Sequence, residues 1–180
     1  LMELGHARIA LITGLPHLST SQERLQGYME AMKAHDIKAT PDLVVQGNFR
    51  SEGAYEAALV LFESKSRPTA VFASNNLMAI GLLKAIAQTG LHCPGDVSVA
   101  AFDDFEEASL FSPPLTTIAQ PTTAIGKKAV ELLLRRIHAK ALVYNPEVIT
   151  IKADLHVRGS CGPPVRTNEV RRKPTTRRST

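Results

Sequence analysis

The stretch PTAVFASNN, residues 68–76, decides the fold class of this chain. Its residues 69–73 form a short apolar run, long enough for a strand that is buried on both faces but too short for a helix. The polar residues 74–76 follow, and a helical pattern of apolar residues begins immediately after them. A buried strand that ends in polar residues and leads into a helix is typical of the carboxyl edge of a parallel α/β sheet, where ligands bind in open sheets.

The same alternation of strands and helices continues on both sides of this stretch. Further strands are predicted at residues 8–13, 43–46, 97–102, 116–120 and 147–158, and further helices begin at Thr20, near Tyr55, at Leu77 and at Pro121. Thr20, with Glu23 three residues later, matches a capping box at the start of its helix. Because strands that alternate with helices pair in parallel through right-handed crossovers, the chain is predicted to form a doubly wound, mainly parallel α/β sheet.

The composition indicates a globular chain of one domain, or of one domain and part of a second. Its 180 residues are 44% hydrophobic and 21% charged, and no apolar run approaches the length of a membrane span, so no membrane partner is expected. Cys93 and Cys161 have neither metal-ligand spacing nor a disulfide framework, which favours reduced thiols in a cytoplasmic protein. The histidines are scattered singly and no glycine-rich phosphate loop is present, so no metal, cofactor or enzymatic role is expected.

The two ends of the chain differ in character from its middle. Residues 1–5 are interpreted as the end of a helix capped by Gly5, and the chain is therefore expected to be a fragment that begins inside a fold. Residues 165–180 contain six basic residues and one Glu, so the rest of the chain carries a net charge of −1 although the whole carries +4. This composition predicts a disordered basic tail over residues 162–180, and the body offers no basic face for a phosphate backbone.

Four side chains of binding type fall at or just after the carboxyl ends of successive predicted strands: Arg24, Phe49, Asn75 and Asp103. They supply a guanidinium with five donors, an aromatic ring, an amide and a carboxylate. Such groups bind a small polyhydroxylated or heterocyclic ligand through directional hydrogen bonds and a ring face, and they do not form an evident catalytic set. Because the carboxyl ends of parallel strands meet at one edge of a sheet, we expect a ligand crevice there.

Asp103 also begins an acidic cluster with Asp104, Glu106 and Glu107. Four carboxylates within five residues can bind a metal or perform acid-base chemistry, but they can equally favour a helix N-terminus or lie in solvent. A magnesium or phosphoacceptor site at Asp103 and Asp104 is therefore an alternative. It would need a further acidic residue and a Lys on other strands, and the sequence does not place them.

The predicted helix over residues 77–89 is apolar nearly all round. A helix on the surface of one domain needs only one buried stripe, so a second apolar side predicts cover by a partner protein. Leu110 and Phe111, which precede a stiff Ser-Pro-Pro sequence, place two more large apolar residues in a short element and suggest a further contact.

Several segments, in this order and spacing, resemble the effector-binding core of LacI/GalR-type transcriptional repressors. They are ERLQG (23–27), GNFRSEG (47–53), PTAVFASNNLMAIG (68–81), DVSVAAFDD (96–104) and PPLTTIAQP (113–121). The resemblance covers about residues 1–161 and implies a periplasmic-binding-protein-like type I fold, in which the effector lies between two α/β subdomains. This chain would contain mostly the C-terminal subdomain, with residues from about 121 to 140 crossing into an incomplete N-terminal one.

The resemblance also implies roles for single residues. The implied effector-binding residues are Arg24, Phe49, Asn75, Asp103 and Gln120, and the implied homodimer contacts are Leu77, Ile80, Lys84, Leu110 and Phe111. The effector would be a sugar, sugar acid, sugar phosphate or purine, and operator DNA would be bound only by an N-terminal helix-turn-helix domain that is missing here. Asn76 stands where the family commonly has Asp, which removes one negative charge. The alternative is the sugar-binding protein of an ABC transporter, which shares the fold and the crevice chemistry but is usually a monomer.

Overall fold

The computed structural model describes residues 1–138 and 146–165 of the chain. Its centre is a six-stranded sheet in the order β2-β1-β3-β4-β5-β6. The strands are β1 (Ile9–Thr13), β2 (Val44–Gln46), β3 (Ala70–Ala73), β4 (Ser98–Phe102), β5 (Thr116–Ala119) and β6 (Asp154–His156). β1 to β5 pair in parallel and β6 pairs antiparallel with β5, which confirms the prediction of a mainly parallel α/β sheet.

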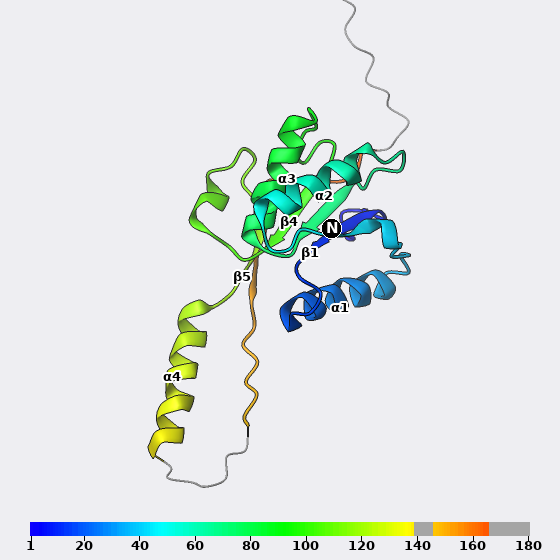
Figure 1. Ribbon diagram of the computed structural model, residues 1–180. Coiled ribbons are helices and arrows are strands. Elements are labelled where there is room, and N and C mark those ends of the chain that lie inside the picture. The colour runs from blue at the N-terminus through cyan, green and yellow to red at the C-terminus, as the bar shows by residue number, and fades with distance from the viewer. Residues whose placement is uncertain (139–145, 166–180) are drawn as a thin grey trace, which may run out of the picture.

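Helices cover both faces of the sheet, as a doubly wound fold requires. They are α1 (Ser19–Ala34), α2 (Ser51–Glu63), α3 (Asn76–Gln88) and α4 (Thr122–His138), with short 3-10 turns at Pro41–Leu43 and Glu106–Ser109. Figure 1 shows α2 and α3 on one side of the sheet and α1 on the other. Successive strand side chains point to opposite faces, so Ile12 packs in the core beneath α2 and α3, whereas Leu11 packs with Tyr28 and Met32 of α1.

The face that carries α1 is only partly covered. The register pairs Phe102 of β4 with Ile118 of β5, and Ile118 with Leu155 of β6, so these three side chains lie on one face. Together with α1 they line a cavity of about 810 Å³. Leu155 is 62% exposed, which shows how little protein lies over this end of the sheet.

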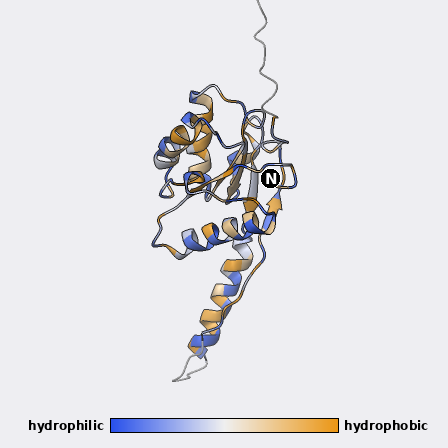
Figure 2. Ribbon diagram, turned by 90° about the vertical axis from the view of Figure 1, so that its right-hand side faces the viewer, coloured by the Kyte–Doolittle hydropathy of each residue, from blue (hydrophilic) through white to orange (hydrophobic). Residues whose placement is uncertain are grey.

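α4 stands apart from the sheet. None of its residues is buried, and its apolar side chains Ile125, Leu133 and Ile137 are exposed. Figure 1 shows α4 projecting away from the sheet, with the chain returning toward β6 alongside it, and Arg135 forms a 3.1 Å ion pair with Glu147 of the returning segment. Apolar and polar residues are mixed along the length of α4 in Figure 2. The predicted strand over 147–158 is therefore mostly unpaired, because only Asp154–His156 reaches the sheet.

The predicted capping box at Thr20 is wrong. α1 begins at Ser19, its N-cap residue is Leu18, and no side chain caps it. Residues 1–5 form a turn rather than a helix, although the Gly5 N–H donates to the Met2 carbonyl at 2.9 Å and Gly5 has the positive φ of +96° expected for a cap.

The C-terminal segment is held against the start of the chain by a buried histidine. His6 is 1% exposed, with Nδ1 2.9 Å from Thr69 Oγ1 and Nε2 2.8 Å from the Gly162 carbonyl. Residues 166–180, most of the predicted basic tail, lie outside the described residues. Within residues 1–138 and 146–165, no helix combines the length and apolar character that crossing a membrane requires.

Candidate functional site

Arg24 lies where the sheet connections diverge. β1 has β2 on one side and β3 on the other, so the loops that leave β1 and β3 run in opposite directions, which is the arrangement at which open α/β sheets bind ligands. Arg24, on α1 after β1, donates through its Nη1 to the carbonyl of Ser74, directly after β3. The guanidinium of Arg24 therefore lies at a strand end, that of β3, as the sequence predicts.

The guanidinium of Arg24 is held by aromatic rings and a carboxylate. Its Cζ lies 3.9 Å from the centroid of the Phe102 ring and 5.9 Å from that of Phe49. Its Nη1 lies 4.0 Å from Asp103 Oδ2, and the side chain is only 16% exposed. Burial lowers the pKa of Arg24, an effect that nearby Asp103 opposes. A planar cation on a ring face, beside one carboxylate, is well placed to donate to a ligand oxygen or nitrogen.

Asp103 and Gln120 extend this polar edge across two more strands. Asp103 directly follows β4 and has a φ of +71°, a left-handed conformation that is uncommon for a residue with a side chain. Its Oδ1 accepts a 2.5 Å hydrogen bond from Nε2 of Gln120, which directly follows β5. Arg24, Asp103 and Gln120, three of the five predicted effector-binding residues, therefore form one continuous polar row.

Phe49 reaches the same region through an unusual backbone. Asn48 and Phe49 both have positive φ, at 55° and 59°. The Phe49 ring lies so close to Gly14 that a Cβ on Gly14 would overlap it, which explains why glycine follows β1. The Phe49 ring thus packs against the backbone at Gly14, and its centroid lies 5.9 Å from Cζ of Arg24.

Asn75 has a structural duty that sequence reasoning missed. Its Oδ1 accepts a 2.8 Å hydrogen bond from the Met78 N–H and caps α3. The amide nitrogen of Asn75 has both of its hydrogens, and Oδ1 has one further lone pair, for a ligand. Asn preceding a helical pattern is a standard capping signal, and it would have predicted this role. The buried hydroxyl of Ser74, next to it, has no hydrogen-bond partner among the residues that the structure describes.

The 810 Å³ cavity is not identical to the predicted crevice. Of the five predicted residues, only Arg24 and Gln120 line it, and its walls are mainly apolar. The apolar lining includes Ile9, Tyr28, Phe72, Phe102, Ile118 and Leu155. This composition follows from the sheet face that α1 leaves uncovered, and the polar row of Arg24, Asp103 and Gln120 meets the cavity only at Arg24 and Gln120.

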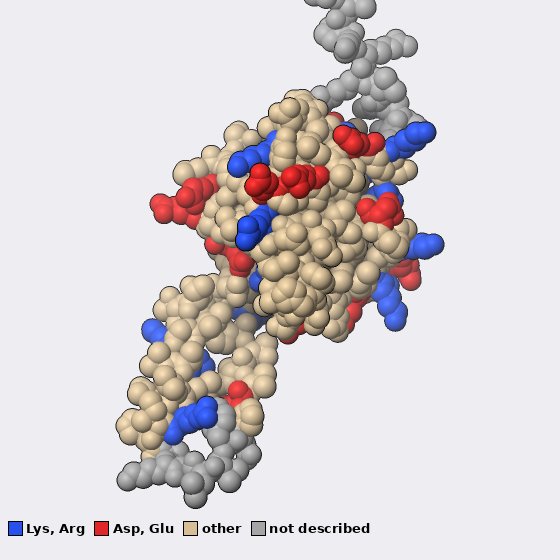
Figure 3. Space-filling model, in the orientation of Figure 1, with Lys and Arg blue, Asp and Glu red and all other residues tan. Residues whose placement is uncertain are grey.

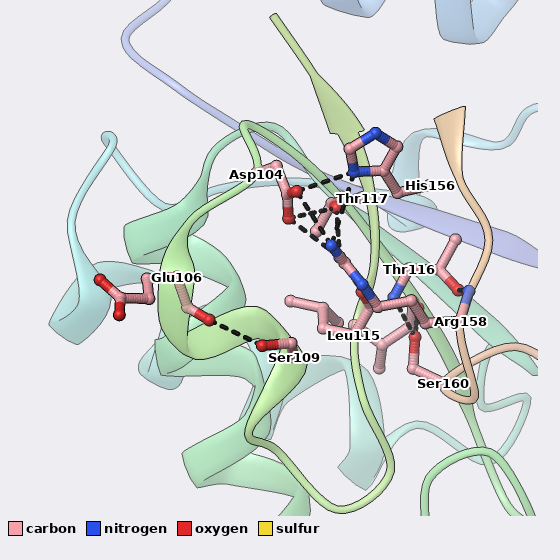
Figure 4. A network of polar contacts seen from close by, with 10 residues as sticks. Asp104, Glu106, Ser109, Leu115, Thr116, Thr117, His156, Arg158 and Ser160 are labelled. Atoms are coloured by element: carbon pink, nitrogen blue, oxygen red, sulfur yellow. Dashed lines mark hydrogen bonds and ion pairs between the residues drawn. The ribbon is translucent and has the colours of Figure 1, made fainter. Parts of the chain in front are cut away.

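Asp104 points away from the crevice and is paired with basic groups. Its carboxylate accepts hydrogen bonds from Arg158, which chiefly holds the pKa of Asp104 well below its usual range. In the described residues no three His, Cys, Asp or Glu side chains are grouped as metal ligands. Glu106 and Glu107 lie exposed in the 3-10 turn that follows, and Figure 4 shows Glu106 directed away from Asp104.

The predicted dimer residues lie on the outer side of α3 and on the loop after β4. Leu77 is 47% exposed and Leu110 is 77% exposed, whereas Ile80 and Phe111 are half-buried and Lys84 is exposed. Figure 3 shows acidic and basic side chains interspersed on the face in view, without a continuous basic field. Leu77 and Leu110 therefore leave apolar surface exposed at these positions.

Comparison with known proteins agrees with this architecture. The family described as "Periplasmic binding protein-like domain" matches residues 1–161. The HTH-type transcriptional repressor PurR of Vibrio vulnificus is 41% identical over 158 residues, which are 88% of this chain and 47% of that protein. The ribose operon repressor of Haemophilus influenzae is 44% identical over 154 residues, which are 83% of this chain and 46% of that protein.

A solved structure with the same fold is the lac repressor dimer bound to operator and the anti-inducer ONPF. It matches with a TM-score of 0.79 and 29% identity, over 90% of this chain and 55% of that one. The chain therefore belongs to the periplasmic-binding-protein-like domain family. The relatives and the solved structure that it resembles are transcriptional repressors, the lac repressor among them. The chain spans about half the length of the curated relatives it matches. These relatives are repressors, so they do not favour the ABC-transporter alternative.

Proposed function

We propose that this chain is the effector-sensing and dimerisation core of a transcriptional repressor, and that it binds a small metabolite at the row formed by Arg24, Asp103 and Gln120. The observation that carries the proposal is the Arg24 guanidinium, fixed between the Phe102 ring and the Asp103 carboxylate at the carboxyl edge of the sheet. The names of the relatives support a sugar or a purine as the effector, since one is a ribose operon repressor and another is PurR.

The row has the chemistry that either class of effector needs. Arg24 offers paired N–H donors, Asp103 offers carboxylate acceptors, and Gln120 offers an amide oxygen while its nitrogen holds Asp103. A vicinal diol or the edge of a heterocycle presents a donor and an acceptor side by side, which matches a guanidinium beside a carboxylate. The amide nitrogen of Asn75 and the ring of Phe49 would add a donor and an apolar face.

The effector would act by changing the orientation of two lobes. α4 and residues 146–153 leave the sheet beyond β5 and return at β6. We assign residues from about 121 to 140, of which 139 and 140 lie outside the described residues, to the second, incomplete lobe. The exposed apolar side chains of α4 support this assignment, because an amphipathic helix of this kind needs a partner surface. An effector that binds one orientation more tightly shifts the population toward it.

The same core would pair with a second copy through the outer side of α3. We propose that Leu77, Ile80, Lys84, Leu110 and Phe111 form this homodimer contact. Operator DNA would be contacted by a helix-turn-helix domain outside these 180 residues, in the cytoplasm, where the thiols of Cys93 and Cys161 stay reduced.

The direct test is a thermal-shift screen of this chain with D-ribose, gluconate, ribose 5-phosphate and adenine. A compound that binds the folded state raises the melting temperature by mass action. We expect at least one compound to do so, and Arg24→Ala and Asp103→Ala each to abolish the shift. Arg8→Ala, which removes a cation that pairs with Asp42, is the matched control and should keep it. If the shift survives both crevice variants, the effector site is elsewhere.

A further inference from the structure

Asp103 and Asp104 are consecutive residues with opposite surroundings. Asp103 faces Arg24 and Gln120 in the crevice, whereas Asp104 faces β5 and β6. The left-handed backbone of Asp103, with its φ of +71°, accompanies this change of direction. A residue with a side chain adopts this conformation at a cost in free energy and keeps it only when its neighbours impose it. Asp104, the next residue in the chain, makes contacts that can impose this conformation on Asp103.

Asp104 is held by a dense set of donors, shown in Figure 4. Arg158 donates from both terminal nitrogens, Nη1 to Oδ1 and Nη2 to Oδ2, each at 2.9 Å. Thr117 Oγ1 donates to Oδ1 at 2.7 Å, and Nδ1 of His156 lies 2.8 Å from Oδ2. Arg158 and Asp104 are mostly buried, at 21% and 20% exposure, so water competes little for this two-pronged pairing.

Arg158 also joins the loop after β4 to the two strands beside it. Its Nη1 donates to the Leu115 carbonyl at 2.7 Å, and its backbone N–H donates to Thr116 Oγ1 at 2.9 Å. These residues lie at the start of β5, while Arg158 itself lies just beyond β6. β5 leads into α4 and β6 follows the segment that returns from it. One guanidinium thus joins the loop after β4 to β5, which leads toward α4, and lies just beyond β6, which follows the returning segment.

We propose that Arg158 is a positioning residue for the effector site, because its pairing with Asp104 fixes the loop that directs the Asp103 carboxylate toward Arg24 and Gln120. The expected effect on effector binding rests on the proposed function, whereas the role of Arg158 in fixing the loop does not depend on it. An arginine is needed because its guanidinium donates to both carboxylate oxygens of Asp104 and also to the Leu115 carbonyl and Thr117 Oγ1, whereas a lysine is a single charged point with no planar fork.

The proposal separates two variants that carry the same charge. Arg158→Lys keeps a cation beside Asp104 but loses the fork, so the loop can leave its left-handed conformation. Arg8→Lys is the matched control, because Arg8 also uses two nitrogens, one toward Asp42 and one toward the Ser66 carbonyl, away from the crevice. Arg158→Ala is the stronger perturbation, and circular dichroism would show whether it folds.

The first measurement needs no effector. Hydrogen exchange of peptides that span residues 98–106 and 154–160 should become faster in Arg158→Lys, whereas Arg8→Lys should leave both peptides as in the wild type. The second measurement is titration calorimetry with D-ribose and with adenine. Where the wild type binds one of them, Arg158→Lys should raise Kd about tenfold, the effect of losing one hydrogen bond to a charged group, and Arg8→Lys should change Kd less than about twofold.

The outcomes are distinguishable. Unchanged exchange in folded Arg158→Lys overturns the positioning role, whatever the affinity does. Faster exchange with unchanged Kd for a compound that binds also overturns it, since the loop would then be loosened without consequence for the site. If neither compound binds the wild type and the wider screen is also negative, the proposed function fails, and the exchange measurement still decides whether Arg158 fixes the loop.

Discussion

The Cζ of Arg24 lies 3.9 Å from the centroid of the Phe102 ring, so the cation rests on an aromatic face at the last residue of β4. Asp103, the carboxylate nearest to it in the crevice, is the next residue in the chain. The stacking partner and the counter-ion of Arg24 therefore come from consecutive positions. A change at Phe102 alters the orientation of the cation without altering any charge.

Phe102→Leu should weaken effector binding. A cation on a ring face contributes about 0.5 to 2 kcal/mol, so we expect Kd to rise by roughly 3- to 30-fold in titration calorimetry with whichever of D-ribose or adenine binds. Phe72→Leu is the matched control, because Phe72 lines the same sheet face one strand away without a described contact to Arg24. Equal losses in the two variants would show that only the apolar volume matters.

Gly81→Ala should destabilise the fold although alanine favours helices. A Cβ at Gly81, in α3, would lie 2.9 Å from the backbone carbonyl carbon of Ser51 in α2, and backbone cannot move aside as a side-chain tip can. Forcing α2 and α3 apart should cost about 1 to 3 kcal/mol in urea unfolding. Gly27→Ala, in α1 with nothing within 4 Å of its Cβ, should instead stabilise by about 0.5 to 1 kcal/mol. Two stabilising results would mean that the helices are not in close contact at Gly81.

The stability of the fold should fall in mild acid because of His6. Burial lowers the pKa of His6 below its ordinary 6.5 despite the hydrogen bond to the Gly162 carbonyl. The unfolded chain then binds the proton more readily than the folded one, so the contribution of His6 is complete above 6.5 and is lost as the pH falls below that value. Urea unfolding on either side of this pH should show the decline, and His6→Gln should flatten it. An identical slope in His6→Gln would assign the decline to other groups.

Leu110→Asp should disrupt self-association if the outer side of α3 is a dimer surface. A charge in the centre of an apolar contact should raise the dimer dissociation constant about tenfold or more in sedimentation velocity. Met29→Asp is the matched control, because Met29 is 43% exposed on α1, on the other side of the sheet. A wild-type chain that sediments as a monomer at all concentrations would contradict the proposed dimer contact for this chain.

The mainly parallel sheet and the position of Arg24 and Asp103 at its carboxyl edge could be predicted because both depend on periodicity. Short apolar runs that alternate with helical patterns leave few topologies, and polar residues after each run must gather at one edge. Arg24, Asp103 and Gln120 meet in the structure for this reason. The predicted strand over 147–158 is longer than the paired strand Asp154–His156. Apolar alternation does not distinguish a paired strand from an extended segment that returns from α4.

The remaining details depend on geometry that residue types do not encode. Phe102 ends a predicted strand, and its residue type does not indicate that its ring lies beneath Arg24. The opposite directions of Asp103 and Asp104 follow from a positive φ that only tertiary contacts impose. Asn75 directly precedes a helical pattern, which is a capping signal, but the resemblance to the family implied only an effector-binding role for it.

The antiparallel pairing of β5 and β6 limits how α4 can move. The segment that leaves for α4 and the segment that returns are joined by the pairs Thr117–His156, Ile118–Leu155 and Ala119–Asp154 at the last edge of the sheet. Sliding α4 along this edge would break those pairs, whereas turning it about the edge keeps them. We therefore expect any motion of α4 relative to the sheet to be a rotation with its axis at β5 and β6. Single-molecule fluorescence between labels on α1 and α4 would measure this rotation as a change in the distance between the labels.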